Sequence, residues 1–142
     1  MLGYIRRERL KTELTNAAVR MLEEGAFSWT TGVGVRVARS LIADLADIYQ
    51  HELVEHRRHI KDRYPPSVLS VAATIELASL LMRDRPELQD LAEELLLVSA
   101  LALHRAFDAG HADTAQSLAS EIDLLAEARA PILYKDICPV AF

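Results

Sequence analysis

The sequence predicts an all-α protein, an antiparallel bundle of about five helices that ends in an apolar tail. Three observations support this fold class. Apolar residues make up 51% of the 142 residues, and glycine and proline occur only five times each. Aromatic residues, at 6%, are too few to favour a sheet core. Aliphatic residues recur every three or four positions, which is helical spacing. We treat residues 1–142 as a single helical domain, with residues 131–142 as an extended tail.

The first half of the chain contains two helical patterns. The first has one apolar stripe and ends at Gly25. The second runs from about Val35 to Arg63, with or without a break, and Tyr64-Pro65-Pro66 stops it. The apolar side of the first pattern consists of Leu10, Leu14, Ala17 and Met21. The corresponding side of the second pattern consists of Ala38, Leu41, Leu45, Tyr49, Leu53, His56 and Ile60.

The second half predicts three more helices, over 67–83, 86–109 and 113–130. Asp84 and Glu87 have the spacing of a capping box at the start of one, and Asp113 and Gln116 repeat it. Short connections make the three helices successive antiparallel neighbours. The segment 67–82 is the most apolar, but it is shorter than the roughly 20 residues of a membrane span. We therefore expect no membrane association.

The charge distribution and the single cysteine narrow the classes of function. The net charge of −5 divides into +2 over residues 1–83 and −7 over residues 84–142. Nucleic-acid binding needs clustered positive charge, so nucleic acid is not the partner that we expect. Cys138 has no second cysteine to pair with, and the charged N-terminus does not look like a signal peptide. These features predict a cytoplasmic location.

The segment HELVEHRRH, residues 51–59, holds three of the five histidines and could be a metal site. On a helix, Glu52, Glu55, His56 and His59 fall within an arc of roughly 100°. However, the spacing is not that of the H-E-x-x-H motif, and one helix rarely completes a site alone. We interpret His56, which lies on an apolar stripe, as a hydrogen-bonded core histidine, and we expect neither a metal nor a cofactor.

Two apolar surfaces predict self-association into a homo-oligomer. Leu97 and Leu101 interrupt the charged side of the helix over 86–109, whose other sides already supply a core stripe. The tail is too apolar to remain in water, so it should pack on the bundle or on a partner. Its contribution to the predicted interface is Ile132, Leu133, Tyr134, Ile137, Val140 and Phe142.

The N-terminal third resembles the DNA-binding domain of TetR-type regulators, over about residues 11–51. The resemblance implies a first helix ending in Glu-Gly, a short second helix, and a recognition helix that reads DNA. The segment "LIADLAD", where the family has a turn, looks helical here, and the would-be recognition helix carries Asp44 and Asp47. The matching residues are Ala17, Ala18, Leu22, Glu24 and Gly25, then Val37, Ala38, Arg39 and Leu41, then Ile48, Tyr49 and His51.

Three functional hypotheses follow. The leading one is a non-enzymatic, self-associating helical interaction protein, an adaptor or regulator whose protein partner the sequence does not identify. The alternative is a TetR-like DNA-binding transcriptional regulator. The third is a metal-dependent or RNA-processing helical enzyme, because Arg105 and His111 have the Arg-to-His spacing of some helical ribonucleases. We identify no nucleophile with a base and an acid beside it, so we do not expect an enzyme.

Overall fold

The computed structural model describes residues 2–25, 34–108, 113, 116–120 and 122, and those residues contain helices and no strand. The predicted all-α class is thus confirmed. None of the helices in these ranges is long and apolar enough to cross a membrane. The elements are α1 (Leu2–Gly25), α3 (Val35–Ile48), α4 (Gln50–Ile60), α5 (Pro66–Asp84), the short 3₁₀ helix η1 (Pro86–Leu88) and α6 (Gln89–Asp108).

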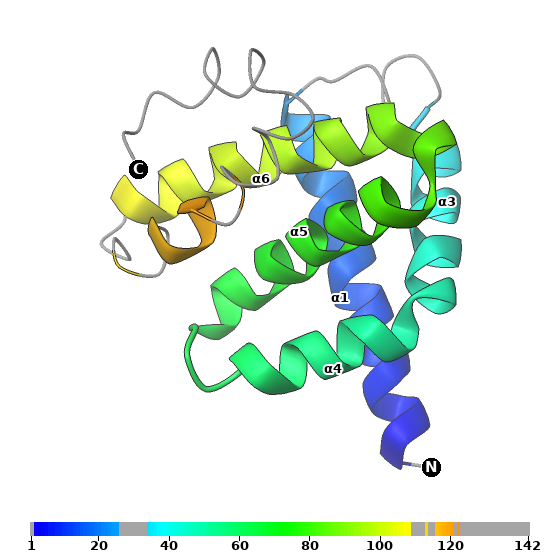
Figure 1. Ribbon diagram of the computed structural model, residues 1–142, viewed down its shortest axis with the longest axis horizontal. Helices are drawn as coiled ribbons and strands as arrows, with labels where there is room; N and C mark the ends of the chain where they lie inside the picture. Colours follow the sequence, from blue (N-terminus) through cyan, green and yellow to red (C-terminus); the bar gives the residue numbers. More distant parts are fainter. Residues whose placement is uncertain (1, 26–33, 109–112, 114–115, 121, 123–142) are drawn as a thin grey trace.

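Helix α5 lies at the centre of the described fold and contacts α1, α4, α6 and η1 (Figure 1). It runs antiparallel to α6, to which η1 joins it, as the short connection predicts. Helix α1 crosses both of them and also contacts α3. A helix that is surrounded in this way must be apolar on nearly every side, which is how the sequence of α5 reads.

The predicted apolar stripes form the core. All four stripe residues of α1 are buried, and along α3 and α4 only Leu41 and His56 are partly exposed. The hydroxyl of Thr74, in the middle of α5, donates to the carbonyl of Ser70 at 2.8 Å, which satisfies a polar group in an apolar setting. The largest side chains that are almost completely buried include Leu14, Leu22, Ile42, Leu53, Ile75, Leu77, Leu81, Leu91 and Leu95.

The long helical pattern over 35–63 breaks at Tyr49, between α3 and α4. Tyr49 has φ −99° and ψ 18°, outside the helical region, while its amide still donates to the carbonyl of Leu45 at 2.9 Å. No glycine or proline marks this position. Instead, the ring of Tyr49 is buried in the core, and its hydroxyl donates to Asp84 at the end of α5, at 3.3 Å.

The predicted capping box at Asp84 and Glu87 is wrong. Asp84 is the last residue of α5, and η1 starts after Arg85 without any side-chain cap. The carboxylate of Asp84 accepts two hydrogen bonds of 2.7 Å from the Arg83 guanidinium and a third from Tyr49. These bonds, those from Arg83 above all, lower the pKa of Asp84. The carboxylate of Asp84 thus binds the charged side chain of the preceding residue, Arg83, and not the backbone amides that a cap would bind.

Part of the predicted fifth helix is described. Residues 113, 116–120 and 122 are helical, with Leu118, Ala119 and Ile122 buried. The rest of that helix and the tail, residues 123–142, lie outside the described residues.

Candidate interaction surface

Helix α3 has one buried side and one exposed apolar flank. Ala38, Ile42, Leu45 and Ala46 face the core. Gly34, with φ 97°, precedes the helix in a conformation that favours glycine, and its carbonyl accepts from the Ala38 amide at 3.1 Å. The large apolar side chains exposed in the described part of the chain are all on α3: Val35 at 37%, Val37 at 54% and Ile48 at 55%.

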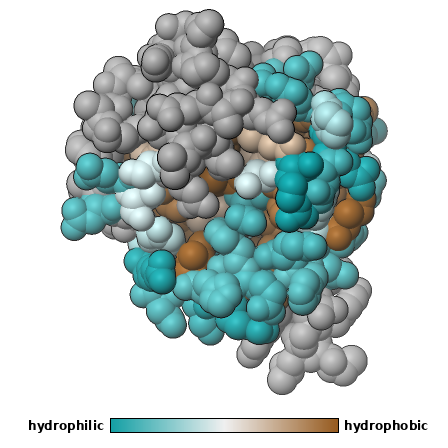
Figure 2. Space-filling view, viewed as in Figure 1, coloured by the Kyte–Doolittle hydropathy of each residue, from teal (hydrophilic) through white to brown (hydrophobic). Residues whose placement is uncertain are grey.

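Two of these exposed residues belong to one continuous stripe. Val37, Leu41, Asp44 and Ile48 are separated by four, three and four residues, which is the spacing of a coiled-coil seam. We call these four residues the α3 flank. Leu41 is partly buried against the core, whereas the other three are exposed. Figure 2 shows hydrophobic atoms at the right-hand edge, where α3 lies, next to the hydrophilic surface of α4.

The charges on α3 run opposite to its helix dipole. Arg36 and Arg39 lie in its first turns, and Asp44 and Asp47 lie toward its C-terminal end. Carboxylates stabilise a helix at its N-terminus and cations at its C-terminus, so this order costs α3 stability. Two of the four charges contact α1: Arg39 donates to the side-chain oxygen of Asn16, and Lys11 donates to Asp47 at 2.8 Å.

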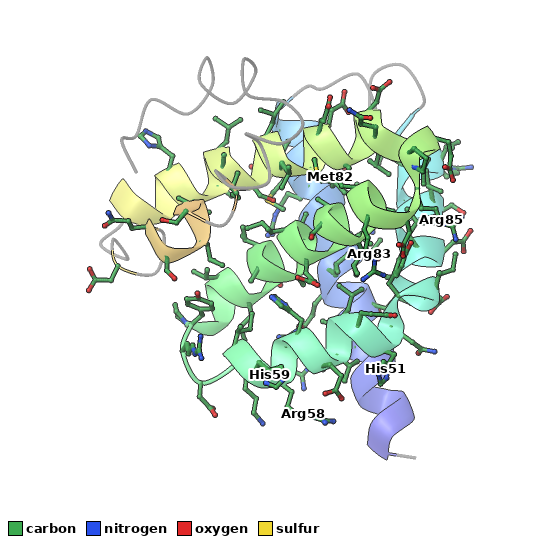
Figure 3. All side chains as sticks on the ribbon, in the orientation of Figure 1. His51, Arg58, His59, Met82, Arg83 and Arg85 are labelled. Atoms are coloured by element: carbon green, nitrogen blue, oxygen red, sulfur yellow. The ribbon has the colours of Figure 1, made fainter. Side chains whose placement is uncertain are left out.

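The histidine-rich segment forms α4, with His51 and His59 exposed near its opposite ends (Figure 3). His56 is half-buried and faces α5, where its Nε2 lies 3.6 Å from an oxygen of Glu76. Glu55 pairs with Arg58 at 2.9 Å. Within the described ranges, no three histidine, cysteine, aspartate or glutamate side chains gather closely enough to hold a metal ion. Of the four predicted candidates Glu52, Glu55, His56 and His59, His56 contacts a neighbouring helix and Glu55 pairs within α4.

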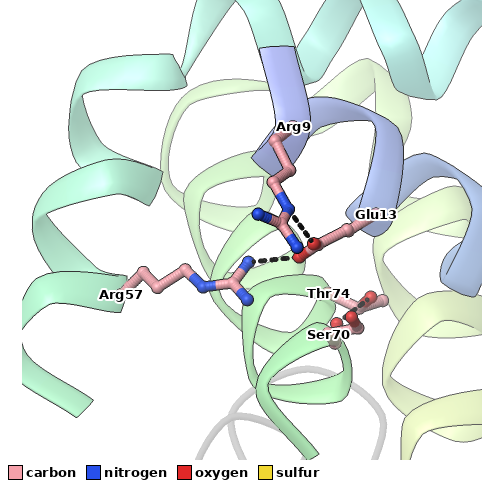
Figure 4. Close-up of polar contacts among 5 residues, drawn as sticks. All are labelled: Arg9, Glu13, Arg57, Ser70 and Thr74. Atoms are coloured by element: carbon pink, nitrogen blue, oxygen red, sulfur yellow. Dashed lines mark hydrogen bonds and ion pairs between the residues drawn. The ribbon is translucent and has the colours of Figure 1, made fainter. Parts of the chain in front are cut away.

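Polar side chains join α4 to α1 and α5. Glu13 of α1 accepts from Arg9 at 3.2 Å and from Arg57 of α4 at 2.9 Å (Figure 4). On the α5 side, burial raises the pKa of Glu76, and the positive charge of Arg83 opposes that effect. Two basic residues of α4, Arg57 and Arg58, are thus paired with carboxylates of the same chain.

The predicted interface residues of α6 differ in their accessibility. Leu97 is only 5% exposed in the single chain, and Leu101 is partly exposed. The tail residues of that interface, Ile132, Leu133, Tyr134, Ile137, Val140 and Phe142, lie outside the described residues, as do His111 and the side chain of Arg105. Self-association through α6 and the tail stays a prediction.

Sequence reasoning missed the α3 flank, although a signal for it exists. Val37 and Ile48, like Val35, are large apolar residues that lie outside the buried side of this helix. The same reasoning that singled out Leu97 and Leu101, apolar residues on an otherwise polar side, applies to both of them.

No protein-family model, curated protein or solved structure matches this chain. The resemblance to TetR-type regulators therefore rests on the quoted residues alone and stays a prediction. The function has to be argued from the surface that the fold presents.

Proposed function

We propose that this chain is a non-enzymatic helical interaction protein that acts through protein–protein contacts, with the α3 flank as its contact surface. The observation that carries the proposal is the exposure of Val37 and Ile48, each more than half exposed, on one stripe. Scattered apolar residues are normal on a protein surface. Val37 and Ile48 instead line up with Leu41 at the spacing of a coiled-coil seam. Helices that bind in a groove or against another helix use apolar anchors at this spacing.

Burial of this stripe would stabilise a complex. Complete burial of a valine or isoleucine side chain is worth roughly 1.5–3 kcal/mol. Val37 and Ile48 are about half exposed, so together they would contribute on the order of 1.5–3 kcal/mol on docking. Leu41 lies between them and would extend the contact. A contribution of this magnitude is typical of a reversible association and not of a permanent complex.

The alternative, DNA binding of the TetR type, finds less support in the same helix. A helix-turn-helix requires a turn between its two helices. Residues 35–48 form one continuous helix, and "LIADLAD" is helical throughout, as the sequence predicts. Asp44 and Asp47 would also approach the phosphates with negative charge.

Site-specific photo-crosslinking tests the proposed function. A photoreactive phenylalanine analogue would replace Val37 or Ile48 in cells that make the protein naturally, with the same replacement of the exposed Lys61 as the control. We expect discrete heavier adducts from positions 37 and 48 and none from position 61. The proposal would fail if positions 37 and 48 gave no adduct, or if position 61 gave the same ones.

A further inference from the structure

We propose that the partner of the α3 flank is the α3 flank of a second copy of this chain, packed antiparallel about a two-fold axis. This inference rests on the proposed function, because it names the partner of that surface. It is carried by two features of α3: the symmetry of its apolar stripe and the order of its charges.

The apolar stripe is self-complementary when it is reversed. Val37 lies near one end of the α3 flank and Ile48 near the other, with Leu41 and Asp44 between them. An antiparallel copy places Val37 against Ile48 of the second copy, and the two-fold axis repeats this contact at the other end. The single two-fold rotation therefore covers both exposed apolar residues of each copy, and no other apolar surface is needed.

The order of the charges selects the antiparallel orientation. In this register Arg36 lies close to Asp47 of the second copy, twice per dimer, whereas a parallel pair would leave the two about 16 Å apart along the helix axis. The carboxylate of Asp47 also accepts from Lys11 of its own chain, so Arg36 would add a second cation beside it. The antiparallel copy also places its carboxylates near the N-terminus of α3 and its Arg36 near the C-terminus. The charge order that disfavours α3 alone thus becomes favourable in the pair.

Asp44 is the polar residue of the seam and lies close to the two-fold axis of the pair. In the antiparallel register it faces Leu41 of the second copy and lies near Ser40 of that copy, whose hydroxyl can donate to its carboxylate. The two Asp44 residues are about 4.5 Å apart along the helix axis. A polar residue at a seam position lowers the stability of the pair, which agrees with a weak dimer.

The two ends of α3 complement each other in shape and in charge. This favours a second copy of the chain as the partner over an unrelated protein. A foreign partner would need to supply an apolar pair and two opposite charges in this order. The helix has 14 residues and is therefore about 21 Å long. A seam this short predicts a weak, reversible dimer.

Two matched valine substitutions test the surface. Val37→Glu and Val35→Glu both place a carboxylate in the first turn of α3, where the helix dipole favours it, so both variants should fold. The two positions are about 200° apart around the helix, so only Val37 belongs to the seam. Circular dichroism would verify the fold of each variant.

Sedimentation velocity across a concentration series measures the monomer–dimer equilibrium of the wild type and of each variant. We expect the wild type to dimerise, Val37→Glu to weaken the dimer at least about tenfold, and Val35→Glu to change it by less than about twofold. A wild type that stays monomeric to about 1 mM, or an equal loss in both variants, would overturn the proposal.

A charge exchange tests the orientation. Arg36→Glu alone should weaken the dimer, since its glutamate meets Asp47 of the second copy. Asp47→Arg alone should do the same, and because it also loses the contact with Lys11 of its own chain, circular dichroism would verify its fold. Mixing the two variants pairs opposite charges at both ends, so a heterodimer should form with close to wild-type affinity. If the mixture associates no better than either variant alone, the antiparallel pairing is wrong.

The two proposals fail in different ways. Photo-crosslinks from positions 37 and 48 to a different protein, together with a monomeric wild type, would overturn self-pairing and leave the proposed interaction function standing. The absence of any adduct would remove both.

Discussion

At the scale of single residues, Glu76 is the one charged side chain in the middle of the apolar helix α5. It lies 3.6 Å from His56, with about a quarter of its side chain exposed. Burial raises its pKa, since the charged form loses water that the contacts replace only in part. An acid whose pKa is higher in the folded chain favours folding at low pH, and that contribution is lost as the pH rises through the folded-state pKa.

The stability of the Glu76→Gln variant relative to the wild type should therefore increase as the pH rises. We expect the two proteins to be closest in stability near pH 4, with the variant more stable by about 1 kcal/mol or less at neutral pH. Urea denaturation across this range measures the difference, with Glu23→Gln on the exposed side of α1 as the control. Parallel stability curves for wild type and Glu76→Gln would contradict the stated role of burial.

At the scale of the elements, α4 is joined to the rest of the fold by a short apolar side and by polar contacts with α1 and α5. Leu53 and Ile60 are its buried residues, and Arg57 bridges to Glu13 of α1 at 2.9 Å. Both charged side chains are about a quarter to a third exposed, so water screens part of their attraction.

A double-mutant cycle on Arg57→Ala and Glu13→Ala should give a coupling energy of about 0.5–1 kcal/mol. It should fall when the salt concentration is raised, since screening weakens such pairs. The pair formed by Arg58 and Glu55 is more exposed and lies within α4, so its cycle is a control with weaker coupling. A zero coupling at low salt for Arg57 and Glu13 would show that the pair does not hold α4.

At the scale of the whole molecule, stability should depend on α5 far more than on the α3 flank. Leu77 is completely buried and Ile48 is 55% exposed. We expect Leu77→Ala to lower the free energy of unfolding by about 2–5 kcal/mol, because the cavity adds to the lost transfer energy. Ile48→Ala should change it by about 0.5 kcal/mol or less at concentrations where the chain is monomeric. Denaturation at low micromolar protein measures both. Equal effects would mean that the flank belongs to the core.

The sequence allowed the fold class, the core stripes and the antiparallel pair α5–α6 to be predicted, because apolar periodicity and helix stops are local signals. Asp84 was misassigned because its carboxylate pairs with the adjacent Arg83 and also accepts from Tyr49, which is 35 residues away in the chain. The break at Tyr49 has no glycine or proline to mark it. The α3 flank was missed because α3 is apolar on more than one side, so its core stripe alone does not show that Val37 and Ile48 stay exposed.

The central claim is that two copies of α3 meet antiparallel, and disulfide trapping measures that geometry most directly. In a Cys138→Ser background, Val37→Cys and Ile48→Cys place one thiol at each end of the flank. In the proposed pair, positions 37 and 48 of different copies are adjacent, whereas identical positions are about 16 Å apart along the helix axis, beyond disulfide reach. The account predicts crosslinked dimers on oxidation of the mixture of the two variants and few from either variant alone. Equal crosslinking in the separate variants, or none in the mixture, would contradict it.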